Sequence, residues 1–374
     1  MKVLHFYKDA LPASMGGVEV VLDNICRATA ALGVENTVLT CTAQPSAAPI
    51  TMDGYKVVQV RENLRLASTA FSWEAIAAYR RLAQEADIIH LHFPNPFADI
   101  LHLISGANKP LIISYHSDIV RQRILLQFYK PIMHRFFSTA DVITVASPNL
   151  QKSSAALQKY ADKVQVIPYG LAEGGLATPD KAAIEKWQPQ LPPRFFLFTG
   201  VMRYYKGLHF LLEAMRGAPH QLVLAGAGAE AHNLQRQAQE QGLEQGLDNV
   251  RFLGFVSEAD KAALLNLCYG FVFPSHLPSE AFGMSLVEAA ICSKPMISCE
   301  IGTGTSYVNQ HDYTGLVVPP ASPADLRAAM DRLVEYPEQT ALYGKQARKH
   351  YETNFTPERQ AQTYLSIYEN LLNK

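Results

Sequence analysis

The stretch GFVFPSHLPSEAFGMSLVEAA, residues 270–290, passes from an apolar strand through a polar loop into a helix. Its apolar start lacks strict alternation, which is typical of a strand buried on both faces of a parallel sheet. Phe282-Gly283 opens the helix, so Glu280 is expected in the loop and Glu288 within the helix. Eight steps of about 100° would leave the two carboxylates about 80° apart on a regular helix, so they do not share one face.

Strand-like runs of the same kind alternate with helix-like segments along the rest of the chain. They are VLHFY (3–7), ADIIHLH (86–92), PLIISYH (110–116), DVITVAS (141–147), FFLFTG (195–200), QLVLAG (221–226), VRFLG (250–254) and PMISCE (295–300). Such a βαβα series predicts doubly wound α/β sheets. Gly and Pro concentrate between 168 and 193, so we expect two α/β domains, 1–180 and 181–356, followed by a helix over 357–372.

Length and composition exclude several classes of protein. The 374 residues are 48% hydrophobic and 18% charged, so the chain can fill two domains and is not disordered. The net charge of −1 gives no reason to expect nucleic-acid binding. Five cysteines without a C-x-x-C pair argue against a disulfide framework or a zinc ribbon. The absence of a signal peptide and of an apolar run near ~18 residues predicts a cytoplasmic protein.

Two glycine-rich strand ends are candidate ligand sites. Gly16 and Gly17 precede a helix at 18–32, where glycines let a ligand approach the backbone and the helix N-terminus attracts anions. An ordinary βα turn is the alternative. LAGAGAE (224–230) begins like a dinucleotide fingerprint, but Ala231 replaces the third glycine. This disfavours an NAD-dependent oxidoreductase and favours a tight turn beside a ligand cleft.

Charged residues follow other strands. Arg203 and Lys206 come after the strand at 195–200, at the edge where open α/β sheets place ligands. A cationic pair there suits the charge that develops on a leaving diphosphate, and solvated surface charge is the alternative. His116 ends the strand at 110–116. A lone histidine is more often structural, but the position of His116 at a strand end makes it a candidate functional residue as well.

The helix after Gly283 is a third candidate site. The N–H groups of Met284, Ser285 and Leu286 can bind phosphate, and Glu288, one turn deeper, can hold the hydroxyls of a ribose. The alternative is that Glu288 only belongs to an ordinary helix. Its apolar flanks argue against this, because an unpaired buried carboxylate is costly.

The segment EAFGMSLVE (280–288) resembles the E-x7-E signature of the retaining GT-B glycosyltransferases in the large "group 1" family. Other family-like segments occur in the expected order over nearly the whole chain: GGVE (16–19), SYHSD (114–118), VIPYG (166–170), RYYKG (203–207), LAGAG (224–228), VRFLGFV (250–256), KPMIS (294–298) and TGLVVPP (314–320). EIGTGTSYVN (300–309) is most similar to mannosyltransferase-like members that build O-antigen and exopolysaccharide. The resemblance implies two Rossmann-like domains facing each other across a cleft.

The resemblance also implies roles for the domains and their residues. Residues 1–180 would bind the acceptor, 181–356 would bind the sugar nucleotide, and 357–374 would cross back onto the first domain. The implied catalytic residues are His116, near the 6-hydroxyl of the donor sugar, Arg203 and Lys206, on the leaving diphosphate, and Glu280, which orients the donor. The implied donor-binding residues are Gly16, Gly17, Phe282, Gly283, Met284, Ser285, Leu286 and Glu288.

The chain departs from the family at Val201, where an arginine is common, so Arg203 is expected to supply the guanidinium from a neighbouring position. A D-x-D signature is absent from the sequence, so neither a metal nor a cofactor is expected. No nucleophile is placed for a double displacement. The family-level expectation is a same-face substitution through an oxocarbenium-like ion pair.

Residues 119–140 contain Arg121, Arg123, Lys130 and Arg135 and no acidic residue. An apolar stripe accompanies them: Leu125, Phe128, Ile132 and Phe136. Such a stretch can rest on an anionic membrane and meet a lipid-linked acceptor, which would make the protein peripheral on the inner face of the cytoplasmic membrane. A core-facing helix with solvated basic residues is the alternative, and Pro131 is expected to interrupt any single long helix.

Together these observations predict a retaining, metal-independent glycosyltransferase that moves a hexose from a sugar nucleotide to a saccharide acceptor. Mannose from GDP-mannose and a lipid-linked polysaccharide intermediate are the first expectations. The alternatives are a UDP-sugar donor, or a sugar-nucleotide-binding protein without activity.

Overall fold

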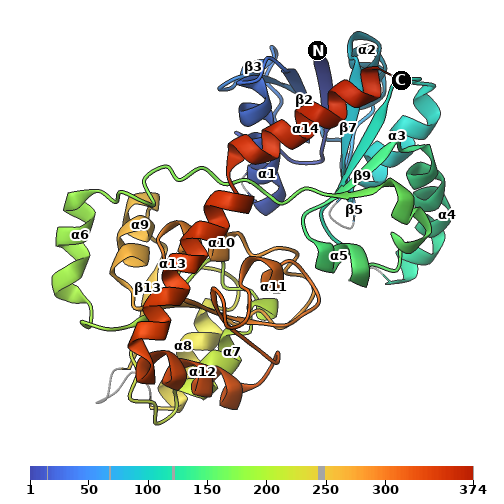
Figure 1. Ribbon diagram of the computed structural model, residues 1–374. Coiled ribbons are helices and arrows are strands. Elements are labelled where there is room, and N and C mark those ends of the chain that lie inside the picture. The colour runs from blue at the N-terminus through green and yellow to red at the C-terminus, as the bar shows by residue number, and fades with distance from the viewer. Residues whose placement is uncertain (15, 67–68, 120–122, 243–248, 374) are drawn as a thin grey trace. The chain divides into compact units, whose positions relative to one another are not determined.

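The computed structural model describes residues 1–14, 16–66, 69–119, 123–242 and 249–373. They divide into two compact units. The first unit joins Met1–Gly170 to Thr356–Lys374, and the second unit is Leu171–Phe355. Figure 1 shows that each unit has helices packed on a sheet of its own, and the doubly wound α/β fold predicted for both halves is confirmed.

The elements of the first unit follow one another in the βα order that the sequence predicted. They are β1 (Lys2–Phe6), α1 (Gly17–Ala30), β2 (Glu35–Thr42), β3 (Ile50–Thr51), β4 (Tyr55–Arg61), β5 (Leu64–Leu66), β6 (Thr69–Phe71), α2 (Glu74–Glu85), β7 (Ile88–Phe93), α3 (Pro96–Ser105), β8 (Leu111–Tyr115), α4 (Arg123–Thr139), β9 (Val142–Val145), α5 (Pro148–Ser153), β10 (Val164–Val166) and α14 (Pro357–Leu372).

The elements of the second unit continue the alternation. They are α6 (Lys181–Trp187), β11 (Phe196–Thr199), α7 (Leu208–Met215), β12 (Leu222–Ala225), α8 (Ala231–Glu240), β13 (Val250–Gly254), α9 (Glu258–Leu267), β14 (Gly270–Phe273), α10 (Met284–Ile291), β15 (Met296–Cys299), α11 (Thr305–Val308), β16 (Gly315–Val318), α12 (Pro323–Glu335) and α13 (Pro337–Asn354).

Both sheets reverse their strand order at an internal strand. In the first unit the order is β10-β9-β8-β7-β1-β2-β4-β3, parallel except for the β3–β4 pair, and the reversal falls beside β1. In the second unit the order is β13-β12-β11-β14-β15-β16, and the reversal falls beside β11. Open α/β sheets bind ligands outside the carboxyl ends of the strands at such a reversal. The loops after β11 and β14 are therefore the expected ligand edge of the second unit.

The two faces of the first sheet differ in chemistry. One face is apolar and packs on α2, α3 and α4; its strand residues include Leu4, Phe6, Leu91, Phe93 and Tyr115. The other face carries buried polar side chains that are at most 3% exposed: His5, His90, His92, Ser114 and His116. The strands are buried on both faces, as predicted, but the polar alternation along them was missed.

Helix α14 completes the first unit. It packs along α1 (Figure 1) and points two tyrosines at the polar face. The Tyr364 hydroxyl lies 3.1 Å from Ser114 Oγ, and the Tyr368 hydroxyl lies 2.9 Å from His90 Nδ1. The hydroxyl of Thr356 caps the helix by accepting from the amide of Arg359 at 3.3 Å. The final residues are therefore bonded into the unit formed by the first 170.

The first unit ends at Gly170, earlier than the boundary at 180 expected from the sequence. The reason is a set of bonds that tie the next residues to the second unit. The amide of Leu171 donates to the carbonyl of Phe355 at 2.9 Å, and Asn266 Nδ2 donates to the carbonyl of Leu176 at 2.7 Å. From Leu171 on, the Gly- and Pro-rich stretch thus belongs to the second unit rather than forming a free linker.

All five cysteines are buried and none forms a disulfide, as the sequence analysis expected. Among the helices described, none is long and apolar enough to cross a membrane.

Candidate active site

Lys206 and Glu280 form an ion pair at the ligand edge of the second unit. Lys206 ends a short 3-10 turn after β11, and Glu280 lies in the loop before α10, as predicted. Their side chains are 10% and 12% exposed, and Lys206 Nζ lies 4.4 Å from the centre of the Phe273 ring. Partial burial strengthens the attraction because less water screens it. The structure thus joins two residues to which the sequence analysis gave separate roles.

Glycines let the loops at this edge pack closely. Gly207 has φ +69°, and a Cβ there would overlap the carbonyl oxygen of Pro274. Gly226 has φ +146°, and a Cβ there would overlap the carbonyl oxygen of Gly200. A larger residue at either position would strain the backbone and push the loops apart. The segment 224–230 therefore forms the predicted tight turn, packed on the loop after β11.

Arg203 lies in the same loop and is exposed. Val201 is also exposed, at 53%, whereas Met202 between them is buried and its amide donates to the carbonyl of Ala227 at 2.8 Å. Residues two apart in extended backbone point to the same side. The side chains of Arg203 and Val201 are thus expected on the same side of the loop. That Arg203 takes the place of the family arginine stays a prediction.

Helix α10 begins after Gly283, which is left-handed with φ +91°. Phe282 is buried before it. The amide of Leu286 donates to the carbonyl of Gly283 at 2.9 Å, so one of the three amides predicted to bind phosphate is already engaged. Among the described residues, those of Met284 and Ser285 have no such partner. These two N–H groups are the ones that remain for an anion at the helix N-terminus.

Glu288 is paired with Lys261, a residue of α9 that the sequence analysis did not single out. Glu288 Oε1 lies 2.7 Å from Lys261 Nζ, and the two side chains are 15% and 17% exposed. Burial raises the pKa of Glu288, and the Lys261 ammonium opposes that rise. Burial lowers the pKa of Lys261, but Glu288 and Glu258 outweigh this and raise it. The carboxylate is therefore paired with a cation and still partly open to a ligand.

Gly16, the residue before α1, lies against a side chain of the helix itself. Gly16 caps the helix in an extended conformation, and a Cβ there would lie 2.6 Å from Glu19 Oε2. Burial raises the pKa of Glu19, while its own backbone amide opposes that rise. Gly17 faces open space. The predicted approach of donor phosphates therefore requires the Glu19 carboxylate to move at Gly16 but not at Gly17.

His116 is 3% exposed, and both of its ring nitrogens are engaged within the first unit. His116 Nε2 lies 3.0 Å from His92 Nδ1, and His116 Nδ1 lies 2.6 Å from the hydroxyl of Tyr169. Burial lowers the pKa of His116 from 6.5 to about 3, so the ring is neutral at pH 7. A contact with the donor sugar, as predicted, requires one of these two hydrogen bonds to open.

The basic stretch 119–140 has a different form from the one expected. Pro131 lies inside α4, which continues from Arg123 to Thr139, so the prediction of an interruption was wrong. The apolar stripe divides: Phe136 is fully buried in the core, whereas Leu125 is 51% and Phe128 78% exposed. Phe136, in the second half of the stripe, anchors α4 to the core, whereas Leu125 and Phe128, in the first half, face solvent. Lys130 and Arg135 are exposed, while Arg121 lies outside the described residues.

Sequence reasoning missed Lys261, Tyr169, His5 and His92. The only signal for the histidines was the alternation HLH at 90–92 beside SYH at 114–116, which marks one face of two neighbouring strands. Lys261 gave no local signal, because its partner Glu288 is on another helix.

Two doubly wound parallel sheets with charged and glycine-rich loops at their strand ends define the GT-B class of protein. Solved structures of this class align over nearly the whole chain. The Anabaena protein Alr3699/HepE in complex with UDP matches with a TM-score of 0.80 at 22% identity, covering 99% of this chain and 100% of that one. The apo lipopolysaccharide outer core galactosyltransferase WaaB matches with a TM-score of 0.72 at 16% identity, covering 99% and 100%.

The chain belongs to the group 1 glycosyltransferases. The family model "Glycosyl transferases group 1" matches residues 180–350, and "Glycosyltransferase Family 4" matches residues 15–172. D-rhamnosyltransferase WbpZ of Pseudomonas aeruginosa is 49% identical over 95% of this chain and 92% of its own. O-antigen chain mannosyltransferase C of Escherichia coli is 39% identical over 100% and 99%. The chain is therefore an enzyme that transfers a sugar, related to bacterial O-antigen glycosyltransferases.

Proposed function

We propose that the protein transfers a mannose-configured hexose, with retention, from a GDP-sugar to a saccharide acceptor of O-antigen type. The observation that carries the proposal is the similarity at 49% and 39% identity, over nearly full length, to relatives that transfer D-rhamnose and mannose. These two sugars share one ring configuration and differ only at C6, where D-rhamnose lacks the hydroxyl. GDP-mannose is the first donor to test.

The second unit holds the donor in this proposal. The diphosphate meets the Met284 and Ser285 amides and the Lys206 ammonium, which is already held in place by Glu280. As the glycosidic bond breaks, negative charge grows on the phosphate, and a fixed cation stabilises it more than it stabilises the ground state. Arg203 adds a second cation from the exposed side of the loop. Glu288, paired with Lys261, accepts from the ribose hydroxyls.

The Lys206–Glu280 pair also explains how the site tolerates its own charges without a donor. Each charge neutralises the other at low exposure, which avoids an isolated buried ion. An arriving diphosphate competes for the ammonium and releases the carboxylate to accept hydrogen bonds from sugar hydroxyls. The roles assigned from the sequence, Lys206 on the diphosphate and Glu280 on the donor sugar, then both apply once the donor has separated the ion pair. The proposed reaction is a same-face substitution that uses these cations and helix amides, with no metal.

A 6-deoxy donor is a second candidate, and a specific observation favours it. The relative with the higher identity is the D-rhamnosyltransferase. His116, predicted to lie near the donor 6-hydroxyl, has both nitrogens engaged, so it has no unused group to offer that hydroxyl. GDP-D-rhamnose, which has a methyl group there, would require no such bond to open.

The test is a donor panel on the full chain: GDP-mannose, GDP-D-rhamnose, UDP-glucose and ADP-glucose, each assayed by thermal shift and by transfer to an O-antigen repeat oligosaccharide. Stabilisation and transfer with a GDP-sugar support the proposal, and the ratio of kcat/KM between the two GDP-sugars decides the C6 group. Transfer only from a UDP-sugar would overturn the donor assignment. Nucleotide binding without transfer to any acceptor would favour a binding protein instead.

We further propose that the exposed first half of α4 rests on an anionic membrane, where a lipid-linked acceptor is found. Leu125 and Phe128 are exposed apolar side chains of this half, and Lys130 and Arg135 are exposed cations of the same helix. Apolar side chains enter the boundary of the acyl chains while cations meet the headgroups.

A further inference from the structure

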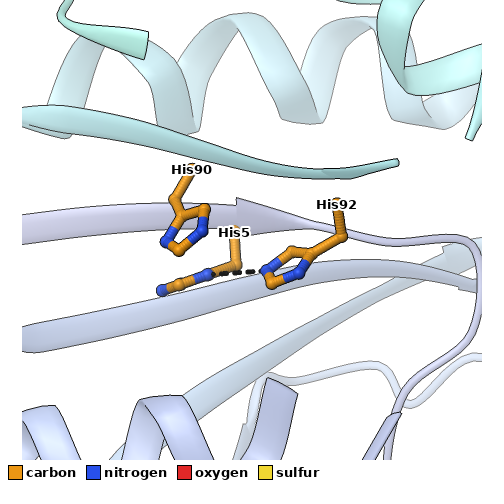
Figure 2. Close-up of side chains that lie close together, drawn as sticks. All are labelled: His5, His90 and His92. Atoms are coloured by element: carbon orange, nitrogen blue, oxygen red, sulfur yellow. Dashed lines mark hydrogen bonds between the residues drawn. The ribbon is translucent and has the colours of Figure 1, made fainter. Parts of the chain in front are cut away.

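Three buried histidines join their rings end to end on the polar face of the first sheet. His5 Nδ1 lies 3.1 Å from His92 Nε2, as Figure 2 shows, and His92 Nδ1 lies 3.0 Å from His116 Nε2. One end of this row meets Asn36, whose Oδ1 lies 3.2 Å from His5 Nε2. The other end meets the hydroxyl of Tyr169, 2.6 Å from His116 Nδ1. The five residues form one continuous histidine chain.

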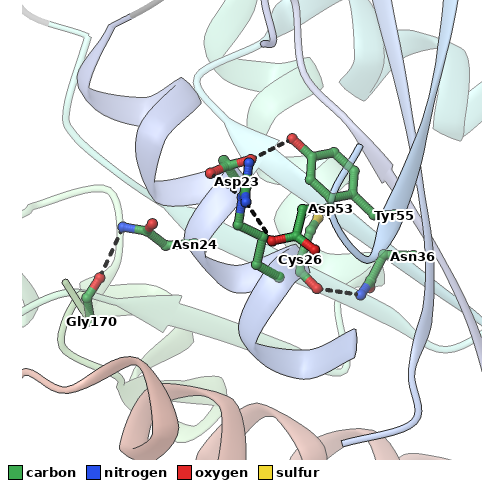
Figure 3. Close-up of polar contacts among 8 residues, drawn as sticks. Asp23, Asn24, Cys26, Asn36, Asp53, Tyr55 and Gly170 are labelled. Atoms are coloured by element: carbon green, nitrogen blue, oxygen red, sulfur yellow. Dashed lines mark hydrogen bonds and ion pairs between the residues drawn. The ribbon is translucent and has the colours of Figure 1, made fainter. Parts of the chain in front are cut away.

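The orientation of the Asn36 amide is determined by its other neighbours. Asn36 Nδ2 donates to the carbonyl of Cys26 at 3.0 Å (Figure 3) and to Thr29 Oγ1 at 2.9 Å. A carbonyl can only accept, and the Thr29 hydroxyl already gives its proton to the carbonyl of Ile25 at 2.7 Å. Since both neighbours need a donor, the amide nitrogen must face them. The oxygen of Asn36 therefore faces His5, and it can only accept.

This end point determines the position of every proton in the histidine chain. A neutral imidazole has one N–H and one acceptor nitrogen. His5 must donate from Nε2 to Asn36, so His5 Nδ1 accepts from His92 Nε2. By the same rule His92 Nδ1 accepts from His116 Nε2, and His116 Nδ1 accepts from the Tyr169 hydroxyl. All the protons then point toward Asn36.

The three rings are neutral at pH 7, which the rule requires. Burial lowers the pKa of His5 to about 4, with Asn36 opposing, and lowers the pKa of His116 to about 3. Burial and the neighbouring histidines hold the pKa of His92 well below 6.5.

We propose that Asn36, His5 and His92 are positioning residues that hold His116 in a single tautomer. In this tautomer the proton is on Nε2, and Nδ1 can only accept a hydrogen bond. A ligand that contacts His116 then takes the place of the Tyr169 hydroxyl and must itself donate. If the proposed function holds, that ligand is a hydroxyl of the donor sugar, which donates to His116 rather than accepting from it. His116 serves as a fixed acceptor and releases no proton to the substrate.

A metal ion is the competing occupant of this region. His5, His90 and His92 place nitrogens within 4.8 Å of one another, and imidazole is a common zinc ligand. Both nitrogens of His90 are engaged, however, at 2.9 Å by the Tyr368 hydroxyl and at 2.7 Å by Ser114 Oγ. A metal between His5 and His92 would also have to replace the proton that their 3.1 Å contact holds. The observed partners at each nitrogen favour a chain of hydrogen bonds over a metal site.

The test is a long-range proton–nitrogen NMR spectrum of the full chain labelled with 15N-histidine at pH 7, with metal content measured on the same sample. His5, His92 and His116 are each expected as the neutral Nε2–H tautomer, in protein without stoichiometric metal. An Nδ1–H tautomer at any of the three, a protonated ring, or one equivalent of bound zinc would overturn the proposal. The native spectrum decides this even where a variant fails to fold.

A pair of variants tests the positioning role. Asn36→Leu removes the acceptor, so His116 is expected to change from one tautomer to a mixture. His90→Phe is the matched control, because His90 lies on the same face, stacked 4.8 Å from His92, but outside the histidine chain. An unchanged His116 spectrum in Asn36→Leu, or the same change in both variants, would contradict the role. Since the readout is a tautomer and not turnover, its failure is distinguishable from failure of the proposed function.

Discussion

Lys261 Nζ lies 2.7 Å from Glu288 Oε1 and equally 2.7 Å from Glu258 Oε2, so one ammonium serves two carboxylates of unequal exposure. The Glu288 side chain is 15% exposed, whereas that of Glu258 is 78% exposed. The partly buried carboxylate is the one assigned to the ribose. The exposed carboxylate provides an internal comparison, since it touches the same lysine.

Glu288→Gln is expected to weaken GDP binding by roughly 10- to 100-fold, because a hydrogen bond to a charged group contributes about 1.5–3 kcal/mol. Glu258→Gln keeps Glu288 and is expected to change the affinity by less than about threefold. Isothermal titration of both variants with GDP checks this. Equal affinities for the two variants and the native protein would contradict the ribose role.

Lys206→Met is expected to lower kcat by about 10²–10³, the cost of removing one preorganised group that stabilises developing charge. The single change also leaves Glu280 unpaired, which lowers stability. Lys206→Met combined with Glu280→Gln removes both charges, so its stability is expected to recover while its kcat does not. Urea unfolding and initial rates on the three proteins separate these effects. Recovery of turnover in the double variant would show that the ion pair is only structural.

Gly207→Ala is expected to destabilise the second unit by about 1–3 kcal/mol more than Gly217→Ala. Both glycines have positive φ, +69° and +63°, so both substitutions strain the backbone. A Cβ at Gly217 meets nothing within 4 Å, whereas one at Gly207 overlaps the carbonyl oxygen of Pro274. Chemical denaturation measures the difference. Equal losses would mean that the loops at the ligand edge are not closely packed.

The buried histidines make stability depend on pH in one direction. Their pKa values in the folded protein, about 4 for His5 and about 3 for His116, lie below the ordinary 6.5. Between these values the unfolded chain binds more protons, so the free energy of unfolding falls as pH drops from about 6.5, by up to about 1.4 kcal/mol per pH unit for each histidine. His92→Phe removes one such group and is expected to show a shallower slope between pH 6.5 and 5 in urea titrations. A slope equal to that of the native protein would argue against a buried, neutral His92.

The protein is expected to co-sediment with anionic vesicles at low salt and to be released as salt rises, because screening weakens the cationic contacts. Phe128→Glu is expected to abolish sedimentation. Phe255→Glu is the matched control: Phe255 is 85% exposed but lies in the second unit, far along the chain from α4. If the native protein stays in the supernatant at low salt, the docking proposal is wrong. Equal effects of the two substitutions would also contradict it.

The fold could be predicted from the sequence because it depends on local signals. Apolar runs mark the strands, glycines mark their ends, and Gly283 marks the start of α10 through its left-handed backbone. The position of Glu280 in the preceding loop followed from the same pattern. The Pro131 prediction failed because α4 packs on the core through Phe136 and tolerates the missing N–H of one proline.

The pairing of side chains could not be predicted in the same way. Lys206 and Glu280 are 74 residues apart in the sequence, and Asn36 and Cys26 meet across two different elements. A single sequence names residue types but not the neighbours that satisfy them. The state of each group, whether a paired carboxylate or a neutral imidazole, is decided by those neighbours and became readable only in three dimensions.

The return of α14 to the first unit has a consequence for synthesis on the ribosome. Tyr364 and Tyr368 supply partners to Ser114 and His90, yet they are made only after all of the second unit has been translated. Domains commonly fold as they emerge, first-made first. Here the first unit cannot complete its polar face until α14 has been made. The second unit is therefore expected to reach its native state first, although it emerges later.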